Sequence, residues 1–524
     1  MGSCTGEKVG MALNTCLRDL CIVFLLLSTL VGCGPELPQY NPNAEVDPNA
    51  TATFALASGV TRFDPHRATS SYDNTWLFPV YDRLIHMSPA GVAVPGLASA
   101  WRFGPNGTWL DLDLRSGVTF HDGEPFNAEA VAINIERAKT VLGSAVKAEL
   151  KHIERVEILD PLHVRLHLNA PDAALPLILS DRAGMMVSPR ALQAGGLDLK
   201  GVGAGPFRHV EFLLGNRSVY ERFDNYWAPE DAGVQRLQLV LTPDTTTRLN
   251  AVRSGQVDGT TIGTLQIEQA QRYNLQVQTG VGLEVLHMQL NRNRSEFSDL
   301  RVRQALNHAV DRKSLVRALS FGYGEASAQH FPTGYMAHDA ATGAGYYNYD
   351  PERARALLAE AGLNKGFSFQ LIVPNIPSYM PLFEVLQYQF AEIGVTAVPW
   401  VLEGAQISER FYGTSEGDAA LVTWGGRPDP SQTIDLLFTP GSLPNPGGHS
   451  TPELMRLARD ARQEIDQQQR PARLQAAAAE ITRQALDLVL YLPSSTFALR
   501  PEVEGMQVWA SGNKPEFRGV RIRR

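Results

Sequence analysis

The distribution of cysteine is the feature that most constrains this chain. All four cysteines lie within the first 33 of its 524 residues, and none follows Cys33. Disulfide bonds therefore cannot stabilise the body of the protein, and a chain of this length has to rely on buried hydrophobic cores. The composition can supply them, since 44% of the residues are hydrophobic and 19% are charged, as in soluble globular proteins.

The N-terminal segment has the pattern of an export signal. Between Leu20 and Val31, only Ser28 and Thr29 interrupt a run of apolar residues. A helix of that length spans about 18 Å, short of the roughly 30 Å hydrocarbon core, so the run is typical of a signal peptide and not of a membrane-spanning helix. No later apolar run approaches 18 residues.

The end of this run, Leu30-Val31-Gly32-Cys33, resembles the lipobox of bacterial lipoproteins. The resemblance implies that residues 1–32 are removed as a lipoprotein signal peptide and that Cys33 becomes the lipidated N-terminus. An uncleaved signal anchor, or an ordinary signal peptide cut near Gly34, is the alternative. Acidic residues offset the basic ones ahead of the apolar run, which is unusual for a signal peptide, and Met11 is an alternative start.

The segment after Cys33 is rich in proline and asparagine. Residues 34–50 contain four prolines, three asparagines and few large apolar side chains. This composition is typical of an extended chain, so we expect residues 33–50 to form a flexible tether. Order is expected from Thr51 onward, beginning with a buried strand at residues 53–57.

The net charge argues against a nucleic-acid ligand. The chain carries a formal charge of −8, and no sustained basic run occurs in it. Proteins that bind nucleic acids usually present a basic patch or stripe to the phosphate backbone. We therefore expect no nucleic-acid partner.

Helix ends and apolar runs predict a mixture of helices and strands. Asn127 can cap a helix over residues 128–139, Asp299 opens one that extends to Val310, and Asp350-Pro351 begins one that stops at Gly362. Strands are predicted at residues 109–114, 164–168, 236–241, 284–290 and 368–373. Length and mixed elements favour an α/β protein of two or three lobes.

A series of short sequence motifs runs through the chain in a fixed order. The longest, residues 94–137, contains the run VTFHDGEPFNAEAV. The others are residues 64–66, 81–85, 205–207, 221–227, 251–258, 299–311, 350–362, 424–430 and 490–493. In content and order they resemble the family 5 extracellular solute-binding proteins, the dipeptide, oligopeptide and nickel receptors of ABC importers.

The resemblance implies a two-lobed periplasmic-binding-protein-like fold of type II with an additional domain. Lobe I would comprise residues 51–82, 205–283 and 487–524, the additional domain residues 83–204, and lobe II residues 284–486. Ligand would lie in the cleft between the lobes, and binding would favour closure. The implied protein is a monomeric receptor without a cofactor, tethered on the extracytoplasmic face of a bacterial membrane. It would deliver its ligand to ABC permease subunits driven by cytoplasmic ATPase subunits.

The same resemblance points to candidate ligand contacts. Peptide-binding members carry an aspartate three residues after the tryptophan that matches Trp424, and its carboxylate holds the peptide ammonium group. This chain has Arg427 there, which favours a carboxylate or another acceptor. Asp429 is a possible substitute for the missing carboxylate, and it is also a possible ion-pair partner for Arg427. Further candidates are Trp424, which could stack on ligand or belong to the core, and the loop residues Ser70, Ser71 and Tyr72.

Catalytic and metal sites are the weaker alternatives. His121 lies beside the carboxylate of Asp122 and could act as a general base. Gly123 and Pro125 favour a structural turn instead. No H-E-x-x-H or P-loop pattern occurs. The histidines are scattered. His86, His163 and His167 fall in strand-like segments, and His66, His330 and His449 are loop residues that could face the cleft. Because no two histidines are spaced four residues apart in a predicted helix, we expect no direct metal ligand.

Peptides or amino-acid-derived solutes are the leading ligand class from the sequence. Opines, sugars, and chelated nickel or haem remain open as non-peptide ligands. An exported enzyme or chaperone on the same scaffold is the alternative from another functional class, and a receptor read by a sensor instead of a permease is a third.

Overall fold

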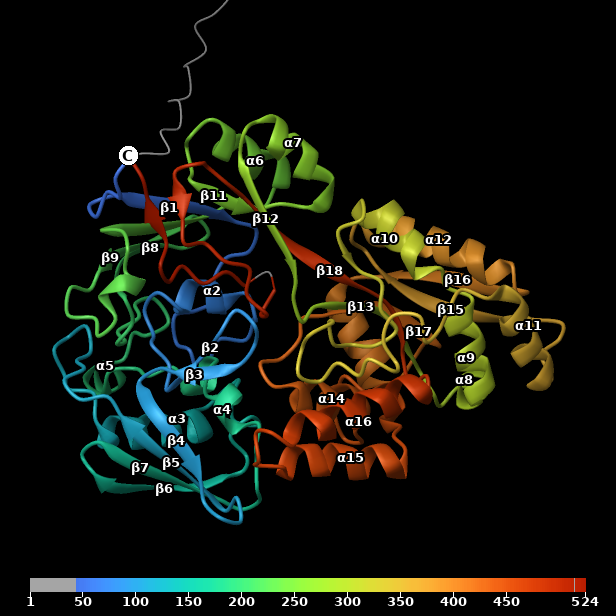
Figure 1. Ribbon diagram of the computed structural model, residues 1–524, viewed down its shortest axis with the longest axis horizontal. Coiled ribbons are helices and arrows are strands. Elements are labelled where there is room, and N and C mark those ends of the chain that lie inside the picture. Colours follow the sequence, from blue (N-terminus) through green and yellow to red (C-terminus); the bar gives the residue numbers. More distant parts are fainter. Residues whose placement is uncertain (1–43, 513) are drawn as a thin grey trace, which may run out of the picture. The chain divides into compact units, whose positions relative to one another are not determined.

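One long strand, β18 (Leu488–Leu499), joins two halves of a large sheet in the computed structural model (Figure 1). Its first residues pair with β13 (Val285–Leu290), and its later residues pair with β11 (Gly259–Thr261) and β12 (Gln276–Val281). Within residues 44–512 and 514–524, which the structure describes, twelve strands belong to this sheet. Backbone hydrogen bonding therefore continues from one half to the other along a single strand.

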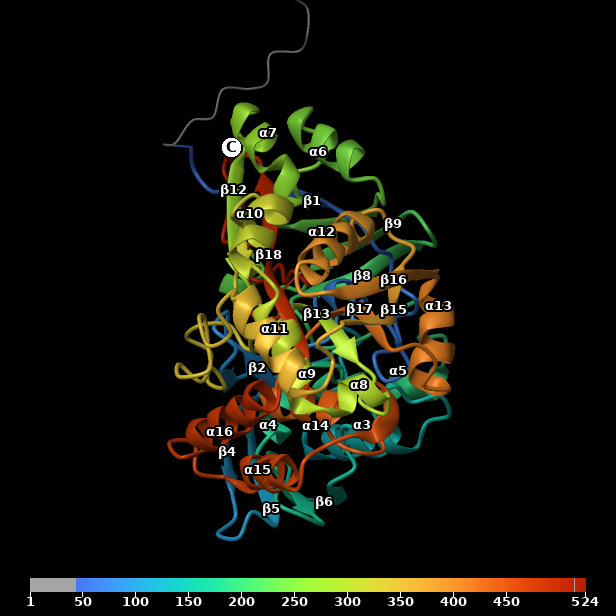
Figure 2. The same cartoon turned by 90° about the vertical axis from the view of Figure 1, so that its right-hand side faces the viewer.

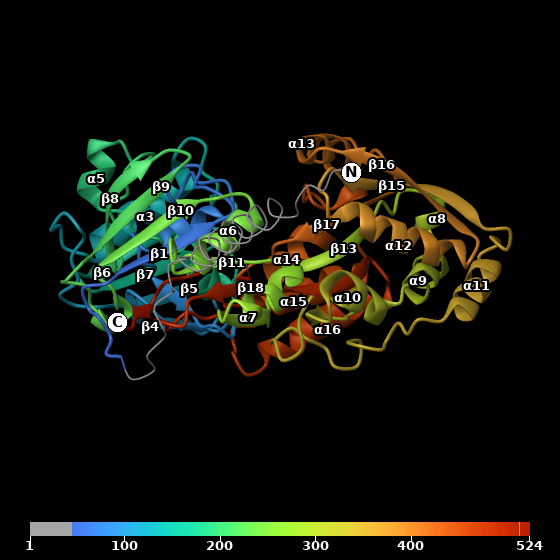
Figure 3. The ribbon, with the colours of Figure 1, turned by 90° about the horizontal axis from the view of Figure 1, so that it is seen from above.

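We call the strands on either side of β18 half-sheet A and half-sheet B. Half-sheet A is ordered β11-β1-β10-β9-β8, with β1 (Thr51–Leu56), β10 (Arg236–Leu241), β9 (Arg217–Arg222) and β8 (Phe207–Leu213). Half-sheet B is ordered β16-β15-β17-β13, with β15 (Phe367–Pro374), β16 (Val395–Leu402) and β17 (Ala419–Trp424). Figure 3 shows β13 and β18 between the two halves.

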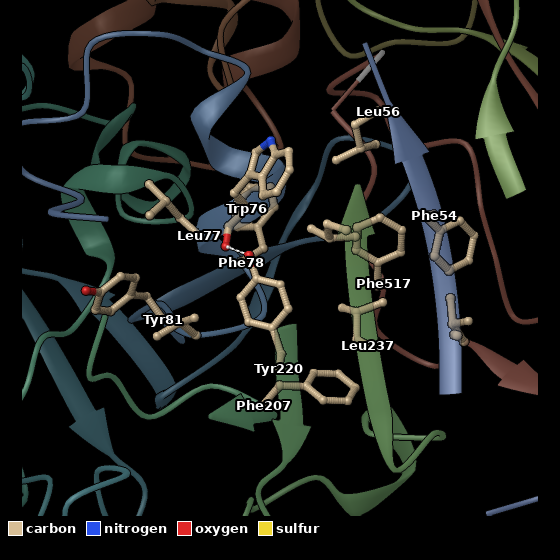
Figure 4. Packing of buried hydrophobic residues seen from close by; sticks show 14 of the residues in the cluster. Phe54, Leu56, Trp76, Leu77, Phe78, Tyr81, Phe207, Tyr220, Leu237 and Phe517 are labelled. Atoms are coloured by element: carbon tan, nitrogen blue, oxygen red, sulfur yellow. Dashed lines mark hydrogen bonds between the residues drawn. The ribbon is translucent and has the colours of Figure 1, made fainter. Parts of the chain in front are cut away.

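Half-sheet A has its own hydrophobic core. Its parallel strands β1 and β10 pack against the short helix α2 (Asp73–Leu77) and its neighbours, and Trp76, Phe207 and Tyr220 are fully or almost fully buried there (Figure 4). The hydroxyl of Tyr220 donates to the carbonyl oxygen of Trp76 at 3.0 Å, which satisfies its polar atom inside the core. Helices α6 (Thr245–Arg253) and α7 (Ile267–Arg272) flank this half.

Half-sheet B has a separate core formed by its strands and four helices. These helices are α9 (Leu300–His308), α10 (Arg312–Ser320), α11 (Pro351–Glu360) and α12 (Tyr379–Ala391). A further group, α14 (Pro430–Phe438), α15 (Pro452–Gln463) and α16 (Arg470–Arg483), follows β17. Figures 1 and 2 show this group beside the small sheet that the next paragraph describes. The amide of Ala173, in the region of the small sheet, donates to the carbonyl of Arg462 in α15 at 2.7 Å.

The small sheet is ordered β4-β5-β7-β6 and carries α3 (Ala128–Thr140) on one face. Its strands are β4 (Ala98–Phe103), β5 (Trp109–Leu114), β6 (Ile153–Asp160) and β7 (His163–Leu168). A two-stranded ribbon of β2 (Ile85–Met87) and β3 (Ala93–Pro95) precedes it. Residues 185–197 include α5 (Pro189–Ala194) and contribute to two cores: Met185, Val187, Ala191 and Leu197 belong to the core of half-sheet A, and Met186 belongs to the core of the small sheet.

Local predictions are confirmed where a helix cap or a strand-like run carried them. The side chain of Asn127 accepts the amide of Ala130 at 3.0 Å at the start of α3, and Asp299 and Asp350 cap α9 and α11. Five of the six predicted strands correspond to β5, β7, β10, β13 and β15 within one residue at each end, and the sixth, residues 53–57, corresponds to β1, which begins two residues earlier and ends one residue earlier. The mixed α/β class is confirmed, whereas the exact lobe boundaries remain a prediction.

The described end of the predicted tether differs from the prediction. Val46 forms an antiparallel bridge with Arg523, and the amide of Asp47 donates to the carbonyl of Ile522 at 2.8 Å. Ala50 is buried. The prediction was wrong for these residues because the C-terminal residues offer backbone partners that composition alone does not reveal. The predicted signal peptide of residues 1–32, the predicted lipidation site Cys33 and residues 34–43 lie outside the described part. None of the helices in the described part is long and apolar enough to cross a membrane.

A pair of glycines sets the spacing between β15 and β16. Gly366 has φ +75°, and a Cβ placed on it would lie 1.8 Å from the carbonyl oxygen of Gly394. Gly362 has a similar φ of +81° but has nothing within 4 Å of its Cβ position. Replacing Gly362 therefore tests the cost of a left-handed backbone alone, whereas replacing Gly366 adds the cost of a steric clash.

We expect Gly366→Ala to destabilise the protein more than Gly362→Ala. Both should cost about 1–2 kcal/mol for the left-handed conformation, and Gly366→Ala should add about 1–3 kcal/mol for the clash with Gly394. Thermal unfolding of the two variants checks this. Equal shifts in Tm would show that the strands can move apart without cost.

Candidate ligand cavity

A cavity of about 360 Å³ lies where three parts of the fold meet. Thr69 and Ser71 line it from the loops that follow β1, and Lys514 lines it from the C-terminal segment. The remaining lining residues are Ala145, Glu149 and Arg182 from the small-sheet region, Trp424 at the end of β17, and Gly425, Gly426 and Arg427 in the loop that follows it. A second cavity of about 430 Å³ shares Ala145, Glu149 and Arg427 with it, so the hollow continues towards α14.

A glycine fixes the loop that carries Arg427. Gly426 has φ +67°, and a Cβ placed on it would lie 2.5 Å from the Cβ of Leu283 and 2.6 Å from the carbonyl oxygen of Leu283. Leu283 lies between β12 and β13, where the chain passes from half-sheet A to half-sheet B. Only glycine allows this close approach, so the loop is held against the crossing point of the two halves.

Arg427 lines the cavity without an acidic partner. Its guanidinium carbon lies 5.3 Å from the centroid of the Trp424 ring, and its Nε is buried without a hydrogen-bond partner. Among the residues that the structure describes, no carboxylate lies within ion-pair distance of it. The indole nitrogen of Trp424 donates to the hydroxyl of Thr433 at 3.1 Å, which fixes the ring that Arg427 covers. Arg427 is therefore positioned to meet an acceptor inside the cavity.

Asp429 does not line the cavity, in contrast to the role considered for it from the sequence. It is fully buried, and its two carboxylate oxygens each accept from Arg470 at 2.7 Å. It also accepts the amide of Ser431 at 2.9 Å as the N-cap of α14. Both oxygens are thus occupied by the protein, so this carboxylate can neither replace the missing amine anchor nor pair with Arg427.

Of the loop candidates, Ser71 and Tyr72 line different hollows and Ser70 forms a local turn. Ser71 lines the main cavity, whereas the Ser70 hydroxyl accepts the amide of Tyr72 at 3.2 Å in a local turn. Tyr72 is 43% exposed and lines a third hollow of about 270 Å³ with Trp76 and Arg248. Burial and the negative charge of Glu284 raise the pKa of Tyr72.

Three charged residues of the cavity were not expected from the sequence. Arg182 donates to the carbonyl oxygens of Ala68 and, at 3.4 Å, Ser70, while Lys514 donates to the carbonyl of Gly425 at 3.3 Å. Burial lowers the pKa of Lys514. The third, Glu149, has its pKa raised to about 7 by burial and by the nearby Asp181. All three lie outside the α-helices and strands, so no periodic pattern signals that they converge.

The histidines that invited catalytic or metal-binding interpretations have structural partners. His121 is in hydrogen-bond contact with the carbonyl of Gly205 at 2.9 Å, and Asp122 accepts from the Ser188 hydroxyl at 2.6 Å, as expected for a structural turn. Of the loop histidines, His66 contacts Arg137 at 2.9 Å and His449 contacts Asn293.

A buried group could hold a metal ion, but it lies away from the cavity lining. The ligand atoms of His287, His330 and Asp487 lie within 4.8 Å of one another. Asp487 contacts both histidines, at 3.0 Å in the case of His330, and these contacts lower its pKa. Asp487 therefore holds one nitrogen of each histidine, while Nε2 of His287 is buried without a hydrogen-bond partner.

One run fits the G-x-S-x-G pattern of serine hydrolases. It spans residues 413–417 and centres on Ser415. The hydrolase elbow joins a strand to a following helix, whereas Ser415 follows the helical segment Ser408–Gly413 and precedes β17. The order of elements is reversed, so the match does not indicate a nucleophile.

The Asp429–Arg470 ion pair should stabilise the fold and should not contact ligand. We expect Asp429→Asn to lower the free energy of unfolding by about 3–5 kcal/mol, because it leaves Arg470 buried and uncompensated. Glu453→Gln, which removes an exposed ion pair with Arg456, should change the stability much less, because solvent screens the pair. Denaturant unfolding of the two variants checks this difference. A stable Asp429→Asn protein that has lost ligand affinity would contradict this assignment.

Glu149 should give stability a distinct pH dependence. Its pKa is about 7 in the fold and near 4.5 as a free side chain, so the folded state binds its proton more tightly between these values. Its contribution to stability is therefore complete below pH 4.5 and is lost as the pH rises to about 7. We expect the stability of the wild type to fall relative to Glu149→Gln over this window, as measured by thermal unfolding. A constant difference between the two proteins would show that Glu149 ionises normally.

Comparison with known proteins identifies the family. The model of the bacterial extracellular solute-binding proteins, family 5 middle region, matches residues 92–445. The dipeptide-binding protein of Escherichia coli strain K12 is 28% identical over 429 residues, which cover 74% of this chain and 78% of that protein. The glutathione-binding protein GsiB of Pectobacterium atrosepticum is 28% identical over 373 residues, which cover 69% and 71%. The solved structure of HbpA2 from Haemophilus parasuis aligns with a TM-score of 0.79 and 26% identity, covering 91% of this chain and 100% of that one. The chain therefore belongs to family 5 of the bacterial extracellular solute-binding proteins.

Proposed function

We propose that this protein captures a small peptide or amino-acid-derived solute outside the cytoplasm and delivers it to the permease subunits of an ABC importer. The observation that carries the proposal is the cavity in which Lys514, Arg182 and Arg427 meet from three parts of the fold. A ligand that contacts all three parts favours the arrangement in which they are close together, which is how a two-lobed receptor closes.

Two further features support this ligand class. The cavity volume of about 360 Å³ lies within the range of roughly 300–1,000 Å³ that is usual for small-molecule sites. The relatives named above are described as binding a dipeptide and glutathione, both built from amino acids. Opines, sugars, and chelated nickel or haem are the alternative ligands.

We also propose that Cys33 carries a lipid that keeps the receptor at the membrane of its permease. The apolar run before Cys33 and the proline-rich segment after it support this placement on the extracytoplasmic face. The receptor acts as a monomer, and the ATPase subunits that drive transport belong to other chains. No covalent change of the ligand is part of the proposed function.

Native mass spectrometry of protein purified without denaturation tests the receptor function. We expect a co-purified small molecule of intact structure, released by unfolding, and stabilisation of the emptied protein when that molecule is returned. At 100 times its Kd, the ligand should add about 2.7 kcal/mol to the free energy of unfolding. Conversion of the ligand during incubation would favour the enzyme alternative, and unfolded polypeptide as the preferred ligand would favour a chaperone.

Substitution of the predicted lipidation site tests the anchor. We expect Cys33→Ala to move the protein from the membrane fraction to the soluble fraction, with loss of labelling by radioactive palmitate, because the acyl chains supply the membrane affinity. Cys21→Ala, within the apolar run, is the matched control and should keep the label. A Cys33→Ala protein that remains membrane-bound and labelled would disprove the anchor.

A further inference from the structure

The cavity wall presents more cationic donors than the protein satisfies. Arg182 is 6% exposed and Lys514 is 8% exposed, and Arg427 is half-buried beside them. In the part of the chain that the structure describes, none of these three side chains forms an ion pair. Arg182 and Lys514 donate to backbone carbonyls, whereas Arg427 has no hydrogen-bond acceptor there.

The acids near the wall leave Arg427 unmatched. Glu149 is the carboxylate that lines the main cavity with it; the charge of Arg427 lowers the pKa of Glu149, but burial and Asp181 outweigh this and raise it to about 7, and the two side chains form no ion pair. Asp181 is held by the side chain of Asn74 at 2.6 Å and by the amide of Arg182 at 2.7 Å. Asp429, two residues from Arg427, is committed to Arg470. The Nε of Arg427 is buried without an acceptor, which is costly, so an acceptor from a ligand is favoured.

The arginine geometry favours a particular acceptor. A guanidinium presents a planar fork of donors that matches a carboxylate in two parallel hydrogen bonds. Trp424 restricts that fork from one side, and the contact of Gly426 with Leu283 fixes the backbone beneath it. Lys514 donates to the carbonyl of Gly425 in the same loop, so its ammonium group is a second cationic donor at the same wall.

We propose that the ligand presents a carboxylate to Arg427 and Lys514 and that a free ammonium group is not required for binding. This inference rests on the proposed receptor function and narrows its substrate class. The ligand is an amino-acid-derived acid of net negative charge, such as a peptide whose amine is blocked or substituted. The cationic wall would repel the ammonium end that a carboxylate at position 427 would attract.

Two matched probe libraries test the proposal. One contains N-acetylated dipeptides, which keep the carboxylate, and the other contains dipeptide amides with the same side chains, which keep the ammonium group. Each library is incubated with protein that has been unfolded, freed of small molecules and refolded, and native mass spectrometry identifies the retained species. We expect retention from the acetylated library, with affinity by calorimetry at least tenfold higher than that of the matched amide.

Substitutions separate the role of Arg427 from general charge. Arg427→Gln should lower the affinity for the retained acid at least tenfold, and Lys514→Gln should weaken it as well, while Arg427→Lys should restore part of the loss. Arg102→Gln, which removes an exposed arginine of β4, is the control and should leave the affinity unchanged. If Arg427→Gln fails to refold, Lys514→Gln alone decides the result.

Three outcomes would overturn the proposal. They are retention from the amide library, retention of acids that is unchanged in the Arg427→Gln and Lys514→Gln proteins, and retention from neither library. The first two leave a functioning solute receptor with different recognition, so the proposed function would survive them. A protein that also contained no co-purified small molecule would contradict the receptor function itself.

Discussion

Backbone pairing along β18 is the constraint on which the rest of the structure depends. The strand shares its hydrogen bonds between β13 in one half-sheet and β11 and β12 in the other, so both halves are fixed to one continuous element. A strand cannot end between them without leaving buried amides and carbonyls unpaired. The two hydrophobic cores are separate, so each half packs around its own set of buried side chains.

The cavity is built at that crossing because the loop after β17 is attached there. Gly426 packs on Leu283, and Asp429 is tied to Arg470 in α16, so the loop is fixed on both sides of Arg427. The side chain between these two attachments is left without a protein partner. Rigid support around an unsatisfied cation is the arrangement expected of a binding group, since preorganisation reduces the entropy lost when ligand binds.

In the proposed recognition, charge at a single position determines which end of a ligand the receptor binds. The resemblance to peptide-binding members implies an aspartate where this chain has Arg427, and Asp429 does not compensate for it because its oxygens are buried. Arg182 and Lys514 add positive charge from two other parts of the fold. The family therefore fixes the scaffold, and the charges of a few cavity residues select among the solutes that the scaffold can enclose.

The sequence by itself determined the elements, the α/β class and the family. Caps such as Asn127 and Asp350 act on amides a few residues away, and strands such as residues 236–241 carry their own apolar pattern, so these features are local. It also identified Trp424, Arg427 and Ser71, which line the cavity. Tertiary structure alone decided that Asp429 is a buried ion-pair partner, that Val46 and Asp47 pair with the C-terminal segment, and that Glu149, Arg182 and Lys514 meet at one wall. These outcomes depend on contacts between segments from tens to hundreds of residues apart, and a linear pattern carries no information about which distant charge or carbonyl will become the neighbour.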